Sequence, residues 1–234
     1  MDNLIEWDKT DMGVARVQNS PFFVEGEKEK FFKGRPIIGR DKAINGGIYL
    51  GASAREAIVV DDQKDQQLNY AYNELIQLRK KAQEHGETFK QGVLLEAYNL
   101  VKRLIPFDLN NTDRIIGVST KSDRKIALSV FFGGGVCRHQ ALLLAYFLER
   151  LLKEGYLKGK VSIDRNFVDG KGGHAWVRYT NSVGKVFILD PTQNYVGSLD
   201  DIERDDQKWF YERPEEQSSS MRIKNFVKDA FLGE

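Results

Sequence analysis

The chain has 234 residues, of which 41% are hydrophobic and 29% are charged, a composition typical of a soluble globular protein. Its 35 Lys and Arg residues nearly balance its 34 Asp and Glu residues, and a formal net charge of +1 argues against a nucleic-acid partner. The acidic amino-terminal segment has no signal-peptide core, and no apolar stretch approaches the ~20 residues that span a bilayer. We therefore expect a cytoplasmic protein without a membrane span, with export by a route that uses no cleaved signal as the alternative.

The first 65 residues are predicted to form an amino-terminal extension or accessory lobe. Short β-like segments separated by glycine and proline occur at residues 13–17, 22–24, 47–50 and 56–60. The core is expected to follow at residues 66–212.

Two helices are predicted at the start of this core. Apolar residues three and four apart indicate a helix over residues 65–84, which Gly86 ends. A second helix is predicted over residues 88–105, where Pro106 prevents continuation. Residues 105–111 are predicted to be a turn, followed by mixed structure up to Phe132.

The clearest helix begins near Cys137, the only cysteine, and is expected to end at Gly155. Its wide apolar face predicts a helix nearly enveloped by other structure. Cys137 lies in the sequence GGGVCRHQA at residues 133–141, directly at the predicted amino terminus. Such a position stabilises a thiolate, and the amide of Cys137 is placed to donate to an oxyanion. The three glycines are expected to allow close approach of a substrate.

Three strands are predicted after this helix. The first carries Val161, Ile163 and Phe167 on one face. The second and third, at residues 175–179 and 185–189, form a hairpin around a five-residue loop.

The register of this hairpin brings two candidate catalytic residues together. With Tyr179 opposite Lys185, His174 lies opposite Asp190, and Cβ atoms ~4.5–5.5 Å apart permit an imidazole–carboxylate hydrogen bond. Pro191 then ends the ladder because it has no amide donor. A slip of one residue would move Asp190 to the other face of the sheet.

Cys137, His174 and Asp190 are therefore candidates for a nucleophile, its base and the residue that orients the base. A single cysteine is most often a buried small hydrophobe, and only the conjunction of the three motifs favours catalysis. His139 is expected to have a structural or capping role, because it points away from a thiol two residues earlier on a helix.

The carboxyl-terminal residues are predicted to form a linker and a docking helix, at residues 213–234. RPEEQSSS at residues 213–220 is typical of a linker. The apolar residues after it recur at helical spacing and predict a helix that docks on the body or on a partner.

At these motifs the chain resembles the transglutaminase-like superfamily, a branch of the papain-like thiol enzymes. The resemblance covers residues 66–200 and rests on GVCRHQA at 135–141, HAWV at 174–177 and LDPT at 189–192. It implies an α+β fold with the nucleophile at the amino terminus of a central helix packed on an antiparallel sheet. It also implies Cys137 as nucleophile, His174 as general base and acid, and Asp190 as the orienting residue.

Members of this superfamily commonly use a second oxyanion donor, often a Trp or Tyr upstream of the nucleophile. The sequence has no Trp between Trp7 and Trp176, which leaves Tyr98 as a candidate. Val136, Arg138 and Trp176 are further candidates to line the site, although Trp176 is also explained as a core aromatic residue.

The superfamily includes transglutaminases, peptidases, amide hydrolases and deamidases, which share acyl transfer through a thioester. We expect hydrolysis of a protein or peptide substrate, as a cysteine protease or protein-glutamine deamidase, because nothing marks an amine-acceptor site. An amine-dependent transglutaminase is one alternative, and a catalytically silent peptide-binding module is another. No cofactor or metal is expected, since the sequence has neither a calcium loop nor metal-ligand spacing of Cys and His.

Overall fold

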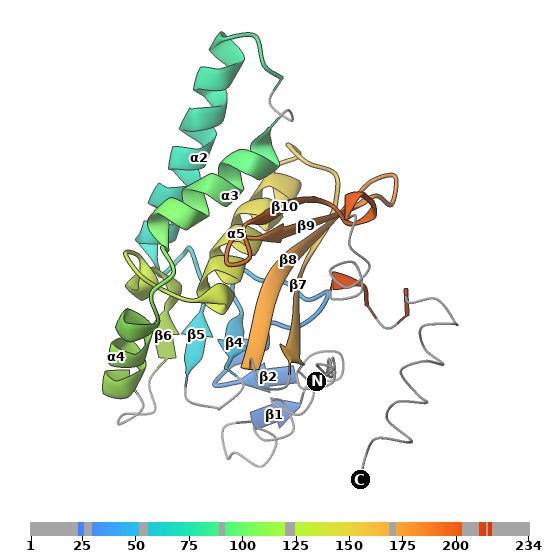
Figure 1. The fold of residues 1–234 in the computed structure, drawn as a ribbon. Coiled ribbons are helices and arrows are strands. Elements are labelled where there is room, and N and C mark those ends of the chain that lie inside the picture. The colour runs from blue at the N-terminus through green and yellow to red at the C-terminus, as the bar shows by residue number, and fades with distance from the viewer. Residues whose placement is uncertain are drawn as a thin grey trace.

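The computed structural model describes residues 23–25, 30–51, 56–88, 92–119, 125–168, 172–202, 211–213 and 215–216. Over these residues the protein is α+β, with four α-helices and three β-sheets (Figure 1). The predicted strand at residues 13–17, the predicted helix after residue 220 and most of the predicted linker lie outside the described residues.

The main sheet has four antiparallel strands in the order β10-β9-β8-β7. The strands are β7 (Gly159–Val168), β8 (Gly172–Asn181), β9 (Val186–Asp190) and β10 (Tyr195–Ser198). They continue into a 3₁₀ turn, η3 (Leu199–Asp201).

Two three-stranded sheets are built mainly by the first 60 residues. One contains β1 (Phe23–Glu25), β2 (Lys30–Phe32) and β3 (Arg35–Pro36). The other contains β4 (Ile48–Leu50), β5 (Ala57–Val59) and β6 (Lys125–Ala127), in which β5 and β6 are parallel. A 3₁₀ turn, η2 (Leu128–Phe131), follows β6.

The helices are α2 (Gln66–Glu84), α3 (Val93–Leu104), α4 (Leu109–Ser119) and α5 (Cys137–Lys153). The predicted helices that correspond to α2, α3 and α5 are confirmed, although α3 begins later than expected, after Gly92 in a left-handed conformation. The region predicted as a turn followed by mixed structure instead contains α4. Asp108 caps this helix by accepting the amide of Asn111 at 2.9 Å. Many residues of α4 are weak helix formers, so the sequence pattern did not indicate a helix there.

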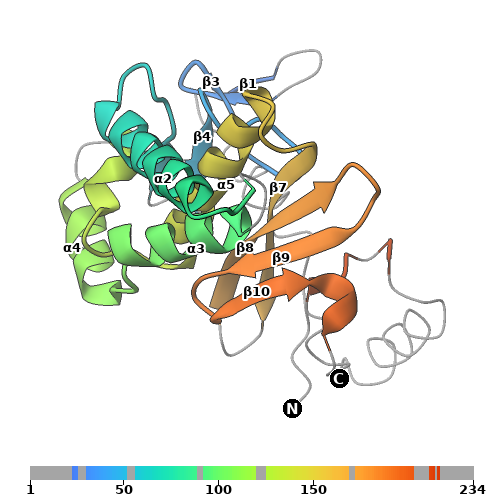
Figure 2. The same ribbon diagram turned by 90° about the horizontal axis from the view of Figure 1, so that it is seen from above.

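Helix α5 is the centre of the core. It packs between β7 and β8 on one side and α3, with α2 behind it, on the other (Figure 2). Every residue from 141 to 148 is fully buried. A helix enclosed on all sides needs apolar residues around its whole circumference, which explains the run of Leu, Ala, Tyr and Phe in this segment.

The described part of the first 65 residues packs into the same core. Ile44, Ile58 and Val60 belong to the apolar cluster that contains α5. Glu149 of α5 also accepts the amides of Ile44 and Asn45, at 2.8 and 2.7 Å. These contacts fix the amino-terminal segment directly against the central helix.

The β8–β9 register differs from the prediction by two residues. Tyr179 pairs with Phe187, not with Lys185, and four residues instead of five separate the two strands. The side chain of Asn181 causes this, because it accepts the amides of Val183 and Lys185 and so closes a shorter turn.

A shift of two residues leaves each side chain on its predicted face, since side chains alternate with a period of two. His174 and Asp190 therefore remain on one face, as diagonal neighbours and not directly opposite each other. Diagonal positions are within reach of a long side chain such as histidine.

The glycines before α5 permit an unusual backbone and close packing within the protein itself. Gly133 has φ +88°, which favours glycine. A Cβ on Gly135, however, would lie 2.6 Å from Cγ2 of Ile105 and 3.1 Å from the His139 ring. The close approach at Gly135 is thus made by the protein's own side chains, which hold the start of α5 against the end of α3.

Gly135→Ala is expected to destabilise the fold by about 1–3 kcal/mol, as overpacking of a buried site does. The measurement is the free energy of unfolding in urea. Gly117→Ala is the matched control, because a Cβ at this α4 position has nothing within 4 Å. Equal stability of the two variants would contradict the packing described for Gly135.

Candidate active site

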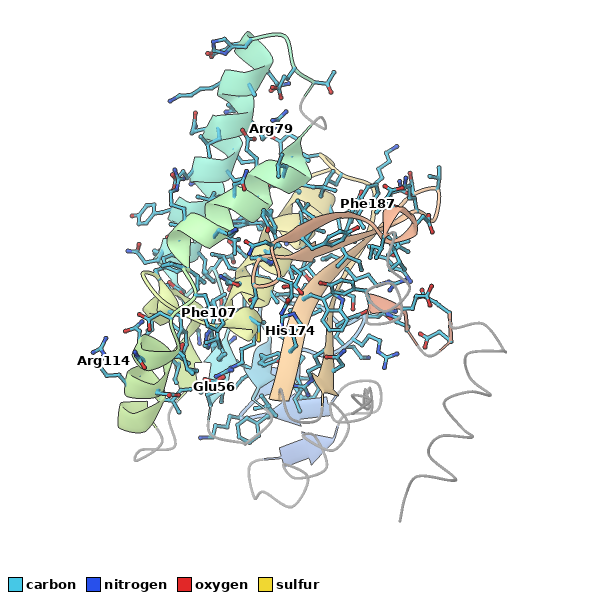
Figure 3. The ribbon with its side chains drawn as sticks, viewed as in Figure 1. Glu56, Arg79, Phe107, Arg114, His174 and Phe187 are labelled. Carbon is cyan, nitrogen blue, oxygen red and sulfur yellow. The ribbon has the colours of Figure 1, made fainter. Side chains whose placement is uncertain are left out.

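The thiol of Cys137 lies at the first turn of α5, beside the backbone of β8. Its Sγ is 4.0 Å from the carbonyl oxygen of Gly173, and it forms hydrogen bonds with the His174 side chain and the Ala175 backbone. Cys137 retains 9% exposure and the His174 side chain 11%, so the pair is largely covered without being sealed. Figure 3 shows His174 at the end of α5 where the helix begins.

The thiol has room at this place because the β8–β9 ladder stops there. The register continues to Val177 opposite Leu189, and two further residues along each strand would bring Pro191 opposite Ala175. Proline has no amide to offer a neighbouring strand. The backbone N–H and C=O groups of residues 173 and 175 point to the same edge of β8. Because β9 has already ended at this level, Cys137 occupies that edge.

His174 is held by a fully buried carboxylate. Its Nε2 lies 2.5 Å from Oδ2 of Asp190, at the end of β9. The same oxygen accepts the Tyr211 hydroxyl at 3.0 Å, and Oδ1 accepts the amide of Gln193 at 3.1 Å. With Nε2 directed to Asp190, Nδ1 is the ring nitrogen left for the thiol.

The electrostatics favour a thiolate–imidazolium pair. Burial alone would raise the pKa of Cys137, but the hydrogen bond and charge of His174, the Ala175 backbone and the Arg138 charge together lower it. Burial would likewise lower the pKa of His174, but Asp190 and Cys137 together raise it to about 10. Each partner therefore stabilises the charged form of the other.

His139 has the expected capping role. Its Nδ1 accepts the amide of Val136 at 3.0 Å, and its ring stacks on Phe131 with centroids 3.6 Å apart. Burial lowers the pKa of His139, which keeps the ring neutral. Because the Val136 amide is engaged in this way, it is not free for an oxyanion, and Val136 occupies the N-cap position directly before α5.

Arg138 is fixed beside the thiol by an ion pair with Glu56. Glu56 comes from the amino-terminal segment, directly before β5, and its side chain is 3% exposed. Burial would raise the pKa of this carboxyl, but His139 and Arg138 lower it. Figure 3 shows Glu56 near the same end of α5 as His174.

The polar residues after the nucleophile and the acid are joined to each other. Gln140, one turn into α5, accepts the Thr192 hydroxyl at 2.7 Å and donates to the carbonyl of Ile105 at 2.8 Å. Thr192 lies two residues after Asp190. This contact ties the helix that carries the thiol to the turn that carries the acid.

Two predicted site residues lie on the acid side of the site. Trp176 is fully buried in a second apolar cluster with Ile188 and Tyr211. Its ring centroid lies 5.8 Å from that of His174. Tyr98, on α3, is buried, and burial together with the Asp190 charge raises its pKa. The described contacts put Tyr98 near Asp190 and link it to no atom of Cys137, which gives no support to its expected role as oxyanion donor.

The sequence did not point to Tyr211, Glu56 or Asn166. Tyr211 and Glu56 reach the site through long-range contacts that carry no local motif. Asn166 on β7 pairs with His174, and its buried amide has no hydrogen-bond partner in the described structure. Hairpin pairing of residues 159–168 with 172–181 is the only signal that would have placed Asn166 beside the histidine.

Within the described residues, no three His, Cys, Asp or Glu side chains converge as metal ligands, and no helix there is long and apolar enough to cross a bilayer. Comparison with known proteins finds no matching family model, curated protein or solved structure.

The rate of Cys137 alkylation by iodoacetamide is expected to reach half its maximum at a pH below the ~8.5 of an ordinary thiol. The midpoint is expected at a lower pH because the pKa of Cys137 is lowered, so the reactive thiolate forms at a lower pH than in an ordinary thiol. In His174→Ala, burial acts without the imidazolium, so the midpoint moves above ~8.5. The rate at neutral pH then falls about tenfold per unit of pKa.

His85→Ala is the control for this measurement. His85 is an exposed histidine whose ring contacts the carbonyl of Lys81 at 2.8 Å, at the end of α2. Its replacement should leave the alkylation profile unchanged. A wild-type midpoint at or above that of an ordinary thiol would contradict the ion pair.

Proposed function

We propose that the protein is a thiol enzyme that transfers an acyl group from an amide bond through a thioester. The observation that carries this proposal is the hydrogen-bonded chain from Cys137 through His174 to the buried carboxylate of Asp190. Such a chain supplies what amide attack requires, namely an ionised nucleophile, a proton donor for the leaving amine and a carboxylate that orients the donor.

The arrangement also supports membership of the transglutaminase-like, papain-like enzymes. The nucleophile lies at the amino terminus of a buried helix packed on an antiparallel sheet. The histidine and the acid lie on adjacent strands of that sheet, in the chain order Cys, His, Asp. These features match what the sequence motifs imply for the family.

In the proposed reaction the Cys137 thiolate attacks the amide carbonyl carbon and forms a C–S bond. Negative charge develops on the carbonyl oxygen, where the amide of Cys137, which lacks an intrahelical partner in the first turn, can donate. His174 gives its proton to the nitrogen as the C–N bond breaks, and the amine leaves. His174 then takes a proton from water, which attacks the thioester and releases the acid and the thiolate.

We favour water over an amine as the acceptor in the second step, as in a peptidase or protein-glutamine deamidase. The largely covered thiol favours a small acceptor, because only 9% of Cys137 is exposed. The free donor and acceptor of the Asn166 side chain beside His174 suit contact with a substrate amide, which is itself both donor and acceptor. An amine-dependent transglutaminase and a silent peptide-binding module are the outcomes that the experiment below must distinguish from hydrolysis.

Incubating a cell lysate with the wild-type protein should produce either deamidated glutamines or new amino termini, identified by mass spectrometry. Cys137→Ala should reduce the rate of product formation by at least about 10³-fold, since the nucleophile acts as a unit with its base. His174→Ala should do the same, and His85→Ala should not.

A labelled primary amine in the same incubation separates the two acyl acceptors. Label incorporated into glutamine side chains would identify transglutamination in place of hydrolysis. If wild type and Cys137→Ala both leave the lysate unchanged but capture the same peptide equally well, the enzyme proposal fails in favour of the binding module.

A further inference from the structure

A short carboxyl-terminal segment crosses the face of the main sheet that is turned away from α5. We name residues 211–213 and 215–216 the carboxyl-terminal strap. Tyr211 packs in the apolar cluster of Trp176 and Ile188, whereas α5 packs against the other face of β8. The strap therefore reaches Asp190 from the side opposite the thiol.

The strap makes a specific polar contact with the candidate catalytic acid. The Tyr211 hydroxyl donates to Oδ2 of Asp190 at 3.0 Å, the same oxygen that His174 contacts. Burial and the negative charge of Asp190 raise the pKa of Tyr211, so the phenol stays protonated as a donor. Tyr211 is itself buried, and its ring packs against two other aromatic rings. Its ring centroid lies 5.3 Å from that of Trp176 and 5.8 Å from that of Tyr195.

Two buried arginines anchor the strap through ion pairs. Arg213 contacts Asp164 of β7 at 2.6 and 2.8 Å and Asp41 at 2.9 and 3.1 Å. Arg178 of β8 pairs with Glu216. An arginine with two carboxylates around its planar fork has little freedom to move, so the position of Tyr211 two residues earlier is well determined.

We propose that Tyr211 is a positioning residue, which acts through Asp190 to fix His174 toward Cys137. This inference rests on the proposed function. Asp190 Oδ2 receives hydrogen bonds from both rings, and Gln193 holds Oδ1, so the plane of the carboxylate is set by three donors. Without the phenol the carboxylate can rotate about its Cβ–Cγ bond, and the imidazole loses its fixed direction.

A double-mutant cycle on the alkylation of Cys137 tests this inference without any knowledge of the substrate. The four proteins are wild type, Tyr211→Phe, Asp190→Asn and the double variant, treated with iodoacetamide at neutral pH. Tyr211→Phe should slow alkylation about tenfold when Asp190 is present, as expected for loss of a hydrogen bond to a charged group. In the Asp190→Asn background, Tyr211→Phe should slow alkylation by less than about twofold.

Tyr195→Phe is the matched control, because it removes a hydroxyl from the same aromatic cluster that donates to the carbonyl of Ser198 instead. It should alkylate at the wild-type rate. An equal loss from Tyr211→Phe in both backgrounds would show a general structural effect and overturn the inference, and so would no loss in either.

The failure of the proposed function has a different signature. If neither His174→Ala nor Asp190→Asn slows alkylation of the wild-type thiol, the catalytic chain itself is wrong and the role of Tyr211 falls with it. If both slow it and only the cycle shows no coupling, the proposed function stands and Tyr211 is a packing residue.

Discussion

The contact between His174 Nε2 and the buried Asp190 carboxylate, at 2.5 Å, is the interaction on which the rest of the site depends. It decides which ring nitrogen faces the thiol and compensates for the burial of both groups. The end of β9 makes the contact possible, since Pro191 stops the ladder and leaves the edge of β8 to Cys137. The fold thus uses an interruption in its sheet to create the site.

Segments distant in the sequence converge on this contact. Glu56 holds Arg138 from the amino-terminal side, Gln140 and Thr192 join α5 to the turn after Asp190, and Tyr211 closes the far face. Charges buried in this region come in pairs, which is what the cost of removing a lone charge from water requires. The site is therefore a product of the whole chain and is not confined to the segment that carries the three motifs.

Features with a local cause could be predicted from the sequence. Helix α5 follows from its apolar circumference, and the shared face of His174 and Asp190 follows from the alternation of β-strands. The predicted register of β8 and β9 was wrong by two residues. The side chain of Asn181 shortens the turn through hydrogen bonds that a strand pattern does not encode. Glu56 and Tyr211 were missed because each reaches the site from more than twenty residues away through tertiary packing alone. Helix α4 was missed because its Asn, Thr and β-branched residues are weak helix formers and only the Asp108 cap marks its start.

The ionisation of Cys137 provides a direct test of the thiolate–imidazolium pair. The chain has one cysteine, so the ultraviolet absorbance of a thiolate, followed against pH, reports a single group. We expect this absorbance to appear at a pH below the ~8.5 of a free thiol, and we expect Asp190→Asn to move its appearance to higher pH. A wild-type titration at or above that of a free thiol, unchanged by the substitution, would contradict the thiolate–imidazolium pair.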